Sequence, residues 1–255
     1  MTDDRSAAQT PTKHRNDTYG EVGRAASADG GPEPIPAATV VLLRDGDAGA
    51  EVLMLHKTSK ISFGGMWVFP GGRIDAADYD AEGDVDTAAR RAAARESKEE
   101  ASIDISPDDF VWFAHWTPPG SSPKRFATWF FATGAAHLDR IAVDGGEIDD
   151  HRWIRPRDAL ARQAEGEIDL APPTWVTLYQ LARQERAADV LSALASQPPR
   201  YYETRVAARG DGVRVALWEG DAGYADWDAD AAGPRHRLTM AAQGFEFSHD
   251  GVDYP

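Results

Sequence analysis

The chain has 255 residues, of which 42% are hydrophobic, carries a formal net charge of −15 and contains no cysteine. Its length and apolar content suit one substantial globular domain with additions, or two small domains. The absence of cysteine excludes disulfides, thiolate metal sites and a cysteine nucleophile. A nucleic-acid partner is not expected, because affinity for a polyanion depends on clustered Lys and Arg.

The sequence shows no apolar run near the ~18 residues that a membrane-spanning helix needs, and no apolar signal region at its polar start. We therefore expect a cytoplasmic protein without a membrane partner. An acidic protein can still bind a small phosphorylated substrate if something offsets the repulsion between carboxylates and phosphate. A divalent cation is the obvious candidate.

The first 33 residues are rich in Asp, Ser, Thr, Gly and Pro, which predicts a disordered tail over 1–33. Beyond it, short apolar runs bounded by turn residues predict strands at 40–43, 51–56, 66–69, 110–116, 125–133 and 151–154. Helices are predicted at 87–101, 156–164, 174–183 and 187–195. The acidic segment 75–86 is interpreted as a loop, and Asp86 or Thr87 as the cap of the helix that follows.

After Pro198 the pattern changes to short strands, predicted at 201–207, 213–218 and 237–241. We therefore divide the chain into a tail (1–33), a main domain (34–197) and a β-rich extension (198–255). Because strands and helices neither alternate strictly nor segregate, the fold is predicted to be either α+β or a three-layer α/β/α sandwich.

The helix predicted at 87–101 carries an unusual group of acidic side chains near its end. Glu96, Glu99 and Glu100 are spaced i, i+3 and i+4, so their carboxylates share one helical face. Like charges this close repel each other by ~1 kcal/mol per pair in water, and more when partly buried. A hard divalent ion such as Mg²⁺ or Mn²⁺ turns that repulsion into attraction. The alternative is a solvated acidic surface.

With the glycines before it, this segment resembles the signature of the Nudix hydrolase superfamily. That signature runs Gly, five residues, Glu, seven residues, then Arg-Glu-U-x-Glu-Glu-x-Gly-U, where U is aliphatic. The chain supplies Gly72, Arg95-Glu96, Glu99-Glu100 and Ile103 in the same order, after the VFPGG of 68–72. The resemblance implies a Nudix-type sandwich with a mixed sheet.

The chain also departs from this signature. The distance from Gly72 to Arg95 exceeds the usual spacing, so 75–86 is interpreted as an insertion. Counted back from Arg95, the first Glu of the signature falls on Thr87 and is missing. Ser97 replaces the aliphatic residue, and Ser102 replaces the glycine at the helix end, where a left-handed non-glycine residue costs ~1 kcal/mol unless the turn is built differently.

The resemblance implies a role for each matching residue. Glu99 and Glu100 would bind the metal directly, Glu96 would be a further ligand or the base that activates water, and the Gly72 carbonyl would be another ligand. Arg95 would pair with a carboxylate of its own site and orient it.

Many Nudix proteins add a carboxylate from a loop outside the signature. In this chain Glu147 is the first candidate, with Asp149 and Asp150 as alternatives. An ordinary polar loop before a strand is the competing interpretation.

The resemblance further implies that water attacks a phosphorus of a small-molecule diphosphate substrate. The insertion, the segment LAPPTWVTLYQL (170–181) and a β-rich tail with PRHRL resemble the subgroup that includes peroxisomal-type coenzyme A diphosphatases. This suggests a nucleoside diphosphate derivative, with coenzyme A among the candidates.

Two alternative functions, and the role of the C-terminal extension, remain open at this point. The chain could be a non-catalytic nucleotide-sensing Nudix regulator, although the tail offers no basic recognition helix. A Nudix-fold isomerase or mismatch-repair-like binder has no support beyond shared architecture. The extension from Arg200 onward could cover the active site or form the interface of a homodimer.

The strand predicted at 110–116 carries three large aromatic side chains in alternation, Trp112, Phe113 and Trp116. One face of this strand could therefore line a substrate pocket.

Overall fold

The computed structural model describes residues 13–24, 31–59, 63–135, 138 and 140–253. Its centre is a mixed sheet in the order β3-β2-β1-β6-β5-β8, with β4 paired to β1 and β7 paired to β2. β1 runs parallel to β6 and β5 runs parallel to β8, and the other pairs are antiparallel. The strands are β1 (Ile35–Gly46), β2 (Gly49–Lys57), β3 (Trp67–Val68), β4 (Gly71–Arg73), β5 (Val111–Thr117), β6 (Phe126–Gly134), β7 (Ile148–Ile154) and β8 (Arg200–Glu203).

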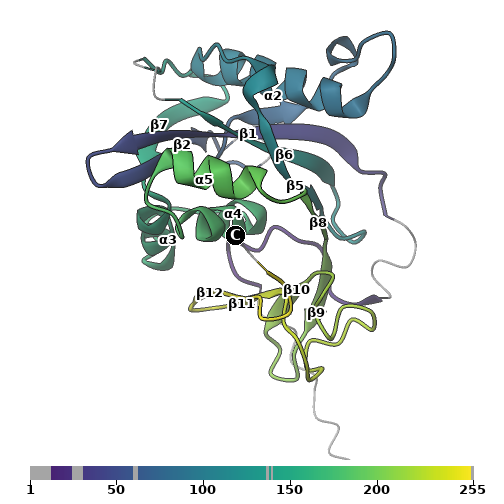
Figure 1. Cartoon of the computed structure of the whole chain (residues 1–255). Coiled ribbons are helices and arrows are strands. Elements are labelled where there is room, and N and C mark those ends of the chain that lie inside the picture. Colours follow the sequence, from purple (N-terminus) through teal and green to yellow (C-terminus); the bar gives the residue numbers. More distant parts are fainter. Residues whose placement is uncertain (1–12, 25–30, 60–62, 136–137, 139, 254–255) are drawn as a thin grey trace, which may run out of the picture.

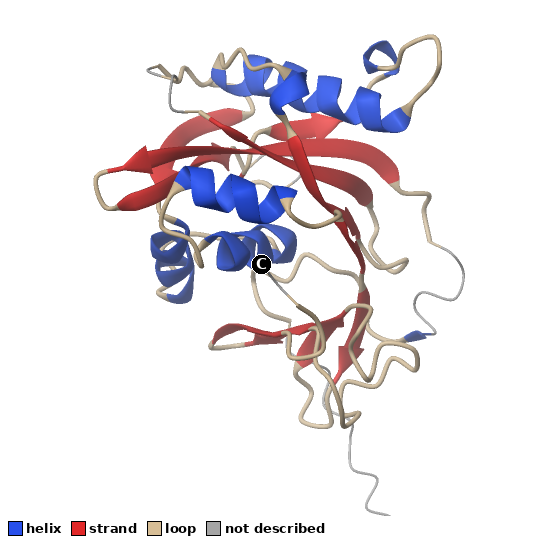
Figure 2. Cartoon of the chain, viewed as in Figure 1, coloured by secondary structure: helices blue, strands red, loops and turns tan. Residues whose placement is uncertain are grey.

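Helices cover both faces of this sheet (Figures 1 and 2). On one face lies α2 (Val85–Ala101), and on the other lie α3 (Pro156–Ala164), α4 (Pro172–Leu181) and α5 (Ala187–Ala195). Val40 and Leu42 pack toward α2, whereas Val41 and Leu43 pack toward α4 and α5. Burial on both faces explains why β1 is continuously apolar. The predicted α/β/α sandwich with a mixed sheet is confirmed.

A second, antiparallel sheet follows, in the order β12-β11-β10-β9. Its strands are β9 (Arg205–Ala208), β10 (Arg214–Leu217), β11 (Arg237–Ala241) and β12 (Gly244–Ser248). The single strand predicted at 201–207 is in fact two strands, because the chain leaves the main sheet at Thr204. There the Thr204 N–H donates to the Thr117 carbonyl (2.9 Å) and its hydroxyl accepts from the Trp218 indole (3.0 Å).

The prediction of a disordered tail over 1–33 is wrong for residues 13–24, which pack into the protein. Asn16, Asp17 and Tyr19 are buried. Their polar groups find partners far along the chain: Asp17 pairs with buried Arg214, and Asn16 bonds to Asp169 (2.6 Å). Composition alone cannot reveal such partners, and a polar composition therefore predicts disorder here. Residues 1–12 and 25–30 lie outside the described residues.

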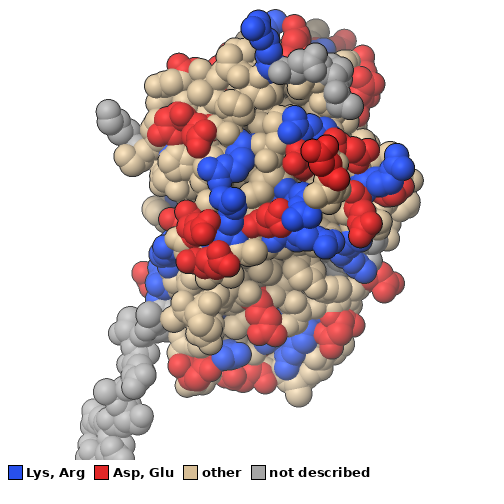
Figure 3. All heavy atoms as spheres, turned by 90° about the vertical axis from the view of Figure 1, so that its left-hand side faces the viewer, with Lys and Arg blue, Asp and Glu red and all other residues tan. Residues whose placement is uncertain are grey.

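Charge is mixed on the face drawn in Figure 3, where Lys and Arg alternate with Asp and Glu. The net charge of −15 therefore does not make this face uniformly acidic. Of the helices described, none combines the length and the apolar character needed to cross a membrane.

Candidate active site

Helix α2 places the acidic group, and both of its ends are defined by local hydrogen bonds. It begins at Val85, two residues before the predicted start, because Asp84 and not Asp86 or Thr87 is the cap: its carboxylate accepts from the Thr87 N–H (2.8 Å). It ends at Ala101 and is capped by Ser102, which adopts the left-handed conformation (φ 57°, ψ 33°) and whose N–H donates to the Lys98 carbonyl (3.0 Å). Ser102 therefore takes the backbone conformation for which the Nudix signature uses glycine.

The three carboxylates differ in exposure and in partners. Glu100 is buried and accepts from the Lys57 ammonium (3.1 Å) and from the Gly71 N–H (3.0 Å). The side chain of Glu96 is 18% exposed and that of Glu99 is 59% exposed, and each accepts a 2.9 Å bond from Arg95. Glu99 is therefore the carboxylate with most freedom to turn.

Burial raises the pKa of two of these carboxylates above the ordinary value for Glu. It raises the pKa of Glu100, an effect that the nearby Lys57 charge opposes. It also raises the pKa of Glu96, and there the hydrogen bond and charge of Arg95 act in the opposite direction. Desolvation thus penalises the charged form of both groups. A cation bound between them would favour the charged forms and so offset that penalty.

Arg95 is held by a carboxylate that the sequence prediction missed. Its Nε and Nη2 donate to the two oxygens of buried Asp78 (3.1 and 3.0 Å), in the short 3₁₀ helix η1 (Ala76–Asp78). The hydrogen bonding of Arg95 to the Asp78 carboxylate, in which Arg95 donates, is the largest cause of a raised Arg95 pKa. Arg95 is therefore a fixed cation that contacts both Glu96 and Glu99.

Asp78 also corrects the alignment with the Nudix signature. Counted forward from Gly72, the sixth residue is Asp78, which occupies the first acidic position of the signature. Counting back from Arg95 had placed that position at Thr87, which lies in the first turn of α2. The extra residues follow Asp78, so a forward count would have found it.

Gly71 and Gly72 allow the backbone to approach both β1 and α2 closely. A Cβ on Gly71 would lie 2.3 Å from the Ala38 carbonyl oxygen, and Gly71 has φ +155°. A Cβ on Gly72 would lie 2.3 Å from a carboxylate oxygen of Glu96. Any larger residue would push Glu96 away from this strand. The structure thus brings Gly72 and the Glu96 side chain together.

Of the three candidates for an additional carboxylate, only Glu147 lines the cavity at this site. Its side chain is 63% exposed and lies 3.9 Å from the Lys57 ammonium. Asp149 instead contacts His56 (2.6 Å), and Asp150 accepts from the His151 N–H (2.8 Å). Asp144 orients the loop, because its carboxylate accepts from the Glu147 and Ile148 N–H groups (3.0 and 2.8 Å).

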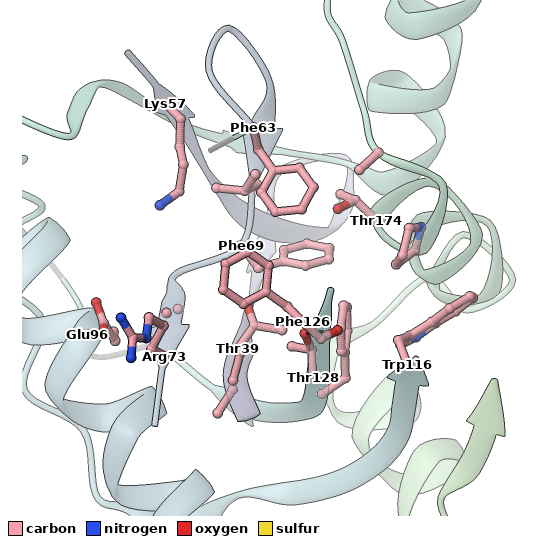
Figure 4. Close-up of a pocket in the computed structure, with 18 of the residues that line it drawn as sticks. Thr39, Lys57, Phe63, Phe69, Arg73, Glu96, Trp116, Phe126, Thr128 and Thr174 are labelled. Carbon is pink, nitrogen blue, oxygen red and sulfur yellow. Dashed lines mark hydrogen bonds between the residues drawn. The ribbon is translucent and has the colours of Figure 1, made fainter. Parts of the chain in front are cut away.

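A cavity of about 1200 Å³ extends away from the carboxylates. Figure 4 shows Lys57, Arg73 and Glu96 on one side of it, with aromatic and hydroxyl side chains on the other. Trp116 and Phe113 are buried on one side of β5, and Trp116 lines the cavity. The expectation that one face of this strand lines a pocket is therefore met by Trp116.

The donor set at the charged end fits a hard divalent cation. It consists of carboxylates with a backbone carbonyl nearby, which are the ligands that such ions prefer. Across the described residues, no three acidic or histidine side chains already converge as a metal shell. Arg95 and Lys57 hold the carboxylates instead, and exposed Glu99 would have to turn toward the ion.

A family model described as the NUDIX domain matches residues 33–174, and the chain therefore belongs to the Nudix family. Among solved structures, a NUDIX hydrolase from Alicyclobacillus acidocaldarius has 26% identity and a TM-score of 0.57, covering 65% of this chain and 99% of its own. The chain is a Nudix hydrolase, and such enzymes generally use divalent metals.

Two more solved structures resemble the chain to a lesser degree. The NUDIX domain of Shewanella oneidensis NrtR, complexed with ADP ribose, has 17% identity and a TM-score of 0.46, covering 61% of this chain and 90% of its own. An Ap4A hydrolase from C. elegans has 22% identity and a TM-score of 0.39, covering 57% and 93%.

Proposed function

We propose that this Nudix hydrolase cleaves the diphosphate linkage of a nucleoside diphosphate derivative, using Mg²⁺ or Mn²⁺ bound at Glu96, Glu99 and Glu100. One observation carries this proposal: three carboxylates from a single helix meet the charged end of a large cavity, and burial raises the pKa of two of them. Such a cluster is costly without a cation.

Each residue of the site would have a distinct role in catalysis. A bound divalent ion would polarise phosphoryl oxygens and lower the pKa of water. Glu99 and Glu100 would hold it, while Glu96, beside the Gly72 backbone, would be a further ligand or accept the proton of the attacking water. Arg95, fixed by Asp78, orients Glu96 and Glu99. Glu147, whose carboxylate lies 3.9 Å from the Lys57 ammonium, would add a carboxylate from outside α2.

Arg73 is a further candidate for contact with substrate phosphate, and the sequence prediction did not include it. Its side chain is exposed and lines the cavity beside Glu96. Within the described residues its guanidinium has no ion-pair partner, whereas Arg95 and Lys57 are committed to carboxylates. A guanidinium binds phosphate through two parallel hydrogen bonds.

The case for a coenzyme A-like substrate rests on the resemblance of the inserted motif and of residues 170–181 to one Nudix subgroup. After α5 the described part of the chain forms strands and turns, so it supplies no recognition helix for a DNA-binding regulator.

Purified protein with Mg²⁺ or Mn²⁺ should be assayed against coenzyme A, ADP-ribose, NADH, dinucleoside polyphosphates and nucleoside triphosphates, with identification of products. We expect cleavage between two phosphorus atoms. Glu99→Gln and Glu100→Gln should each lower turnover by orders of magnitude, whereas Glu165→Gln, an exposed residue outside the cavity, should not. Near-normal turnover in both site variants would rule out the assigned site.

A further inference from the structure

The cavity has two chemically different ends. Beyond the carboxylates it is lined by rings of Tyr19, Phe69, Trp116, Phe126 and Phe130. Its polar groups there are neutral hydroxyls, from residues such as Thr39, Thr128 and Thr174 (Figure 4). Among the described residues, the charged exception is Lys124, whose ammonium lies 4.9 Å from the Phe126 ring centre. An uncharged planar ring with polar edges suits this end, because a second anionic group would lose its hydration against the aromatic rings.

Segments outside the matched family region close this end. Thr18 and Tyr19 come from the N-terminal segment, and Thr204 comes from the point where the chain enters the second sheet, whereas the NUDIX match spans 33–174. Tyr19 and Thr204 are both buried. Beside them Trp116 stacks on Tyr202, with ring centres 3.7 Å apart and parallel planes. We call Thr18, Tyr19 and Thr204 the end wall.

The end wall is fixed in place by buried contacts. Asp17, next to Thr18, forms an ion pair with Arg214 of β10, and the side chains of both are 5% exposed or less. Arg214 also donates to the Gly20 carbonyl (2.7 Å). Gly20 packs so closely on the turn after β5 that a Cβ would lie 2.1 Å from the Ser121 carbonyl oxygen. These contacts hold the end wall on both sides of Tyr19, so the length of the cavity is set before a ligand arrives.

We propose that the end wall determines specificity: Tyr19, with Thr18 and Thr204 beside it, packs against an uncharged ring of the substrate whose phosphate lies at the carboxylates. This rests on the proposed function in placing the phosphate at the carboxylates and in taking that ring to be a nucleobase. The segments that select the substrate would then lie outside the matched Nudix region, although the carboxylates lie within it.

The test is equilibrium binding, by calorimetry on the full chain with Mg²⁺, of ribose 5-phosphate and of AMP, GMP, CMP and UMP. These ligands contain no diphosphate linkage, so binding is measured without turnover. We expect at least one nucleotide to bind ten or more times tighter than ribose 5-phosphate. Tyr19→Ala should reduce that ratio about tenfold and leave the affinity for ribose 5-phosphate unchanged. Tyr19→Phe, which keeps the ring, should retain the ratio.

Thr18→Trp provides a second variant in case Tyr19→Ala does not fold, because Thr18 is only half-buried and the change adds bulk to the end wall. It should weaken nucleotide binding selectively. Equal affinities for nucleotides and ribose 5-phosphate, or equal weakening of both ligands in the variants, would overturn the proposal. A nucleotide preference without hydrolysis of any diphosphate would leave this inference standing and refute the proposed function.

Discussion

Arg95 lies among Asp78, Glu96 and Glu99 and donates to all three. Only Asp78 holds it through both Nε and Nη2, from a buried position. Asp78→Asn removes the charge and one acceptor oxygen, so Arg95 should lose its fixed orientation and Glu96 its alignment. Partners of this kind are typically worth 10–100-fold in activity. We expect kcat to fall by about that factor with little change in KM.

Asp75→Asn is the matched control, because the Asp75 carboxylate is exposed and lies 3.8 Å from Arg95. Its kcat should stay near that of the unaltered enzyme. An Asp78→Asn enzyme with the same kcat and KM as the control would show that Asp78 does not position Arg95. Thermal unfolding of both variants separates this effect from loss of fold.

Substitution of Arg73 should change KM and not kcat, the reverse of the effect expected for Asp78. If its guanidinium binds a substrate phosphate equally in the ground and transition states, Arg73→Ala should raise KM about tenfold and leave kcat nearly unchanged, as expected for loss of one charged hydrogen bond. Steady-state kinetics on the preferred substrate would measure this, with Arg162→Ala as a control outside the cavity. A KM equal to that of the control would remove Arg73 from the site.

At the scale of elements, the end of α2 departs from the family pattern at Ser102. Its left-handed backbone suits glycine better than serine, because a side chain crowds the following carbonyl. Ser102→Gly should therefore stabilise the protein, by about 1 kcal/mol in urea unfolding. Ser196→Gly is the control: Ser196 caps the end of α5 with right-handed backbone geometry, so the substitution should not stabilise the protein. Destabilisation by Ser102→Gly would mean that the serine side chain contributes to the turn.

The elements that sequence patterns predicted best are those whose pattern is local. The helix at 156–164, the helix at 187–195 and the strand at 237–241 were predicted with the bounds that the structure has. The 201–207 prediction failed because apolar alternation continues through Thr204, while the change of sheet depends on distant partners. β12 (Gly244–Ser248) was not predicted, since its short sequence offers only two apolar residues.

For the site as well, the sequence predicts residues related by local spacing but not residues brought together by distant contacts. Glu96, Glu99 and Glu100 could be predicted because one helix fixes their spacing, and Gly72 because it belongs to the same signature. The end wall could not be predicted. Tyr19 and Thr204 are 185 positions apart, and only the buried Asp17–Arg214 pair and the second sheet bring them to one cavity.

At the scale of the whole molecule, the second sheet makes stability sensitive to acid. His236 is buried among aromatic rings, and desolvation lowers its pKa to about 4. In the unfolded chain it takes up a proton near pH 6.5. Between these values the unfolded state binds more protons, so the free energy of unfolding should fall as pH drops from about 6.5 to about 4, by up to ~3 kcal/mol.

Urea unfolding at a series of pH values would measure this slope. His236→Phe keeps a ring in the core but cannot titrate, so its free energy of unfolding should depend less on pH over that interval. An unchanged slope in the variant would assign the acid sensitivity to other groups.

The proposed activity requires that the carboxylates of α2 bind a cation. A crystal soaked in Mn²⁺, with anomalous diffraction data, tests this directly. We predict a manganese peak contacted by Glu99 and Glu100, with Glu96 and the Gly72 carbonyl beside it, and Glu99 turned from Arg95 toward the ion. A cavity without manganese, in which Glu96 and Glu99 still bond to Arg95, would contradict the assignment.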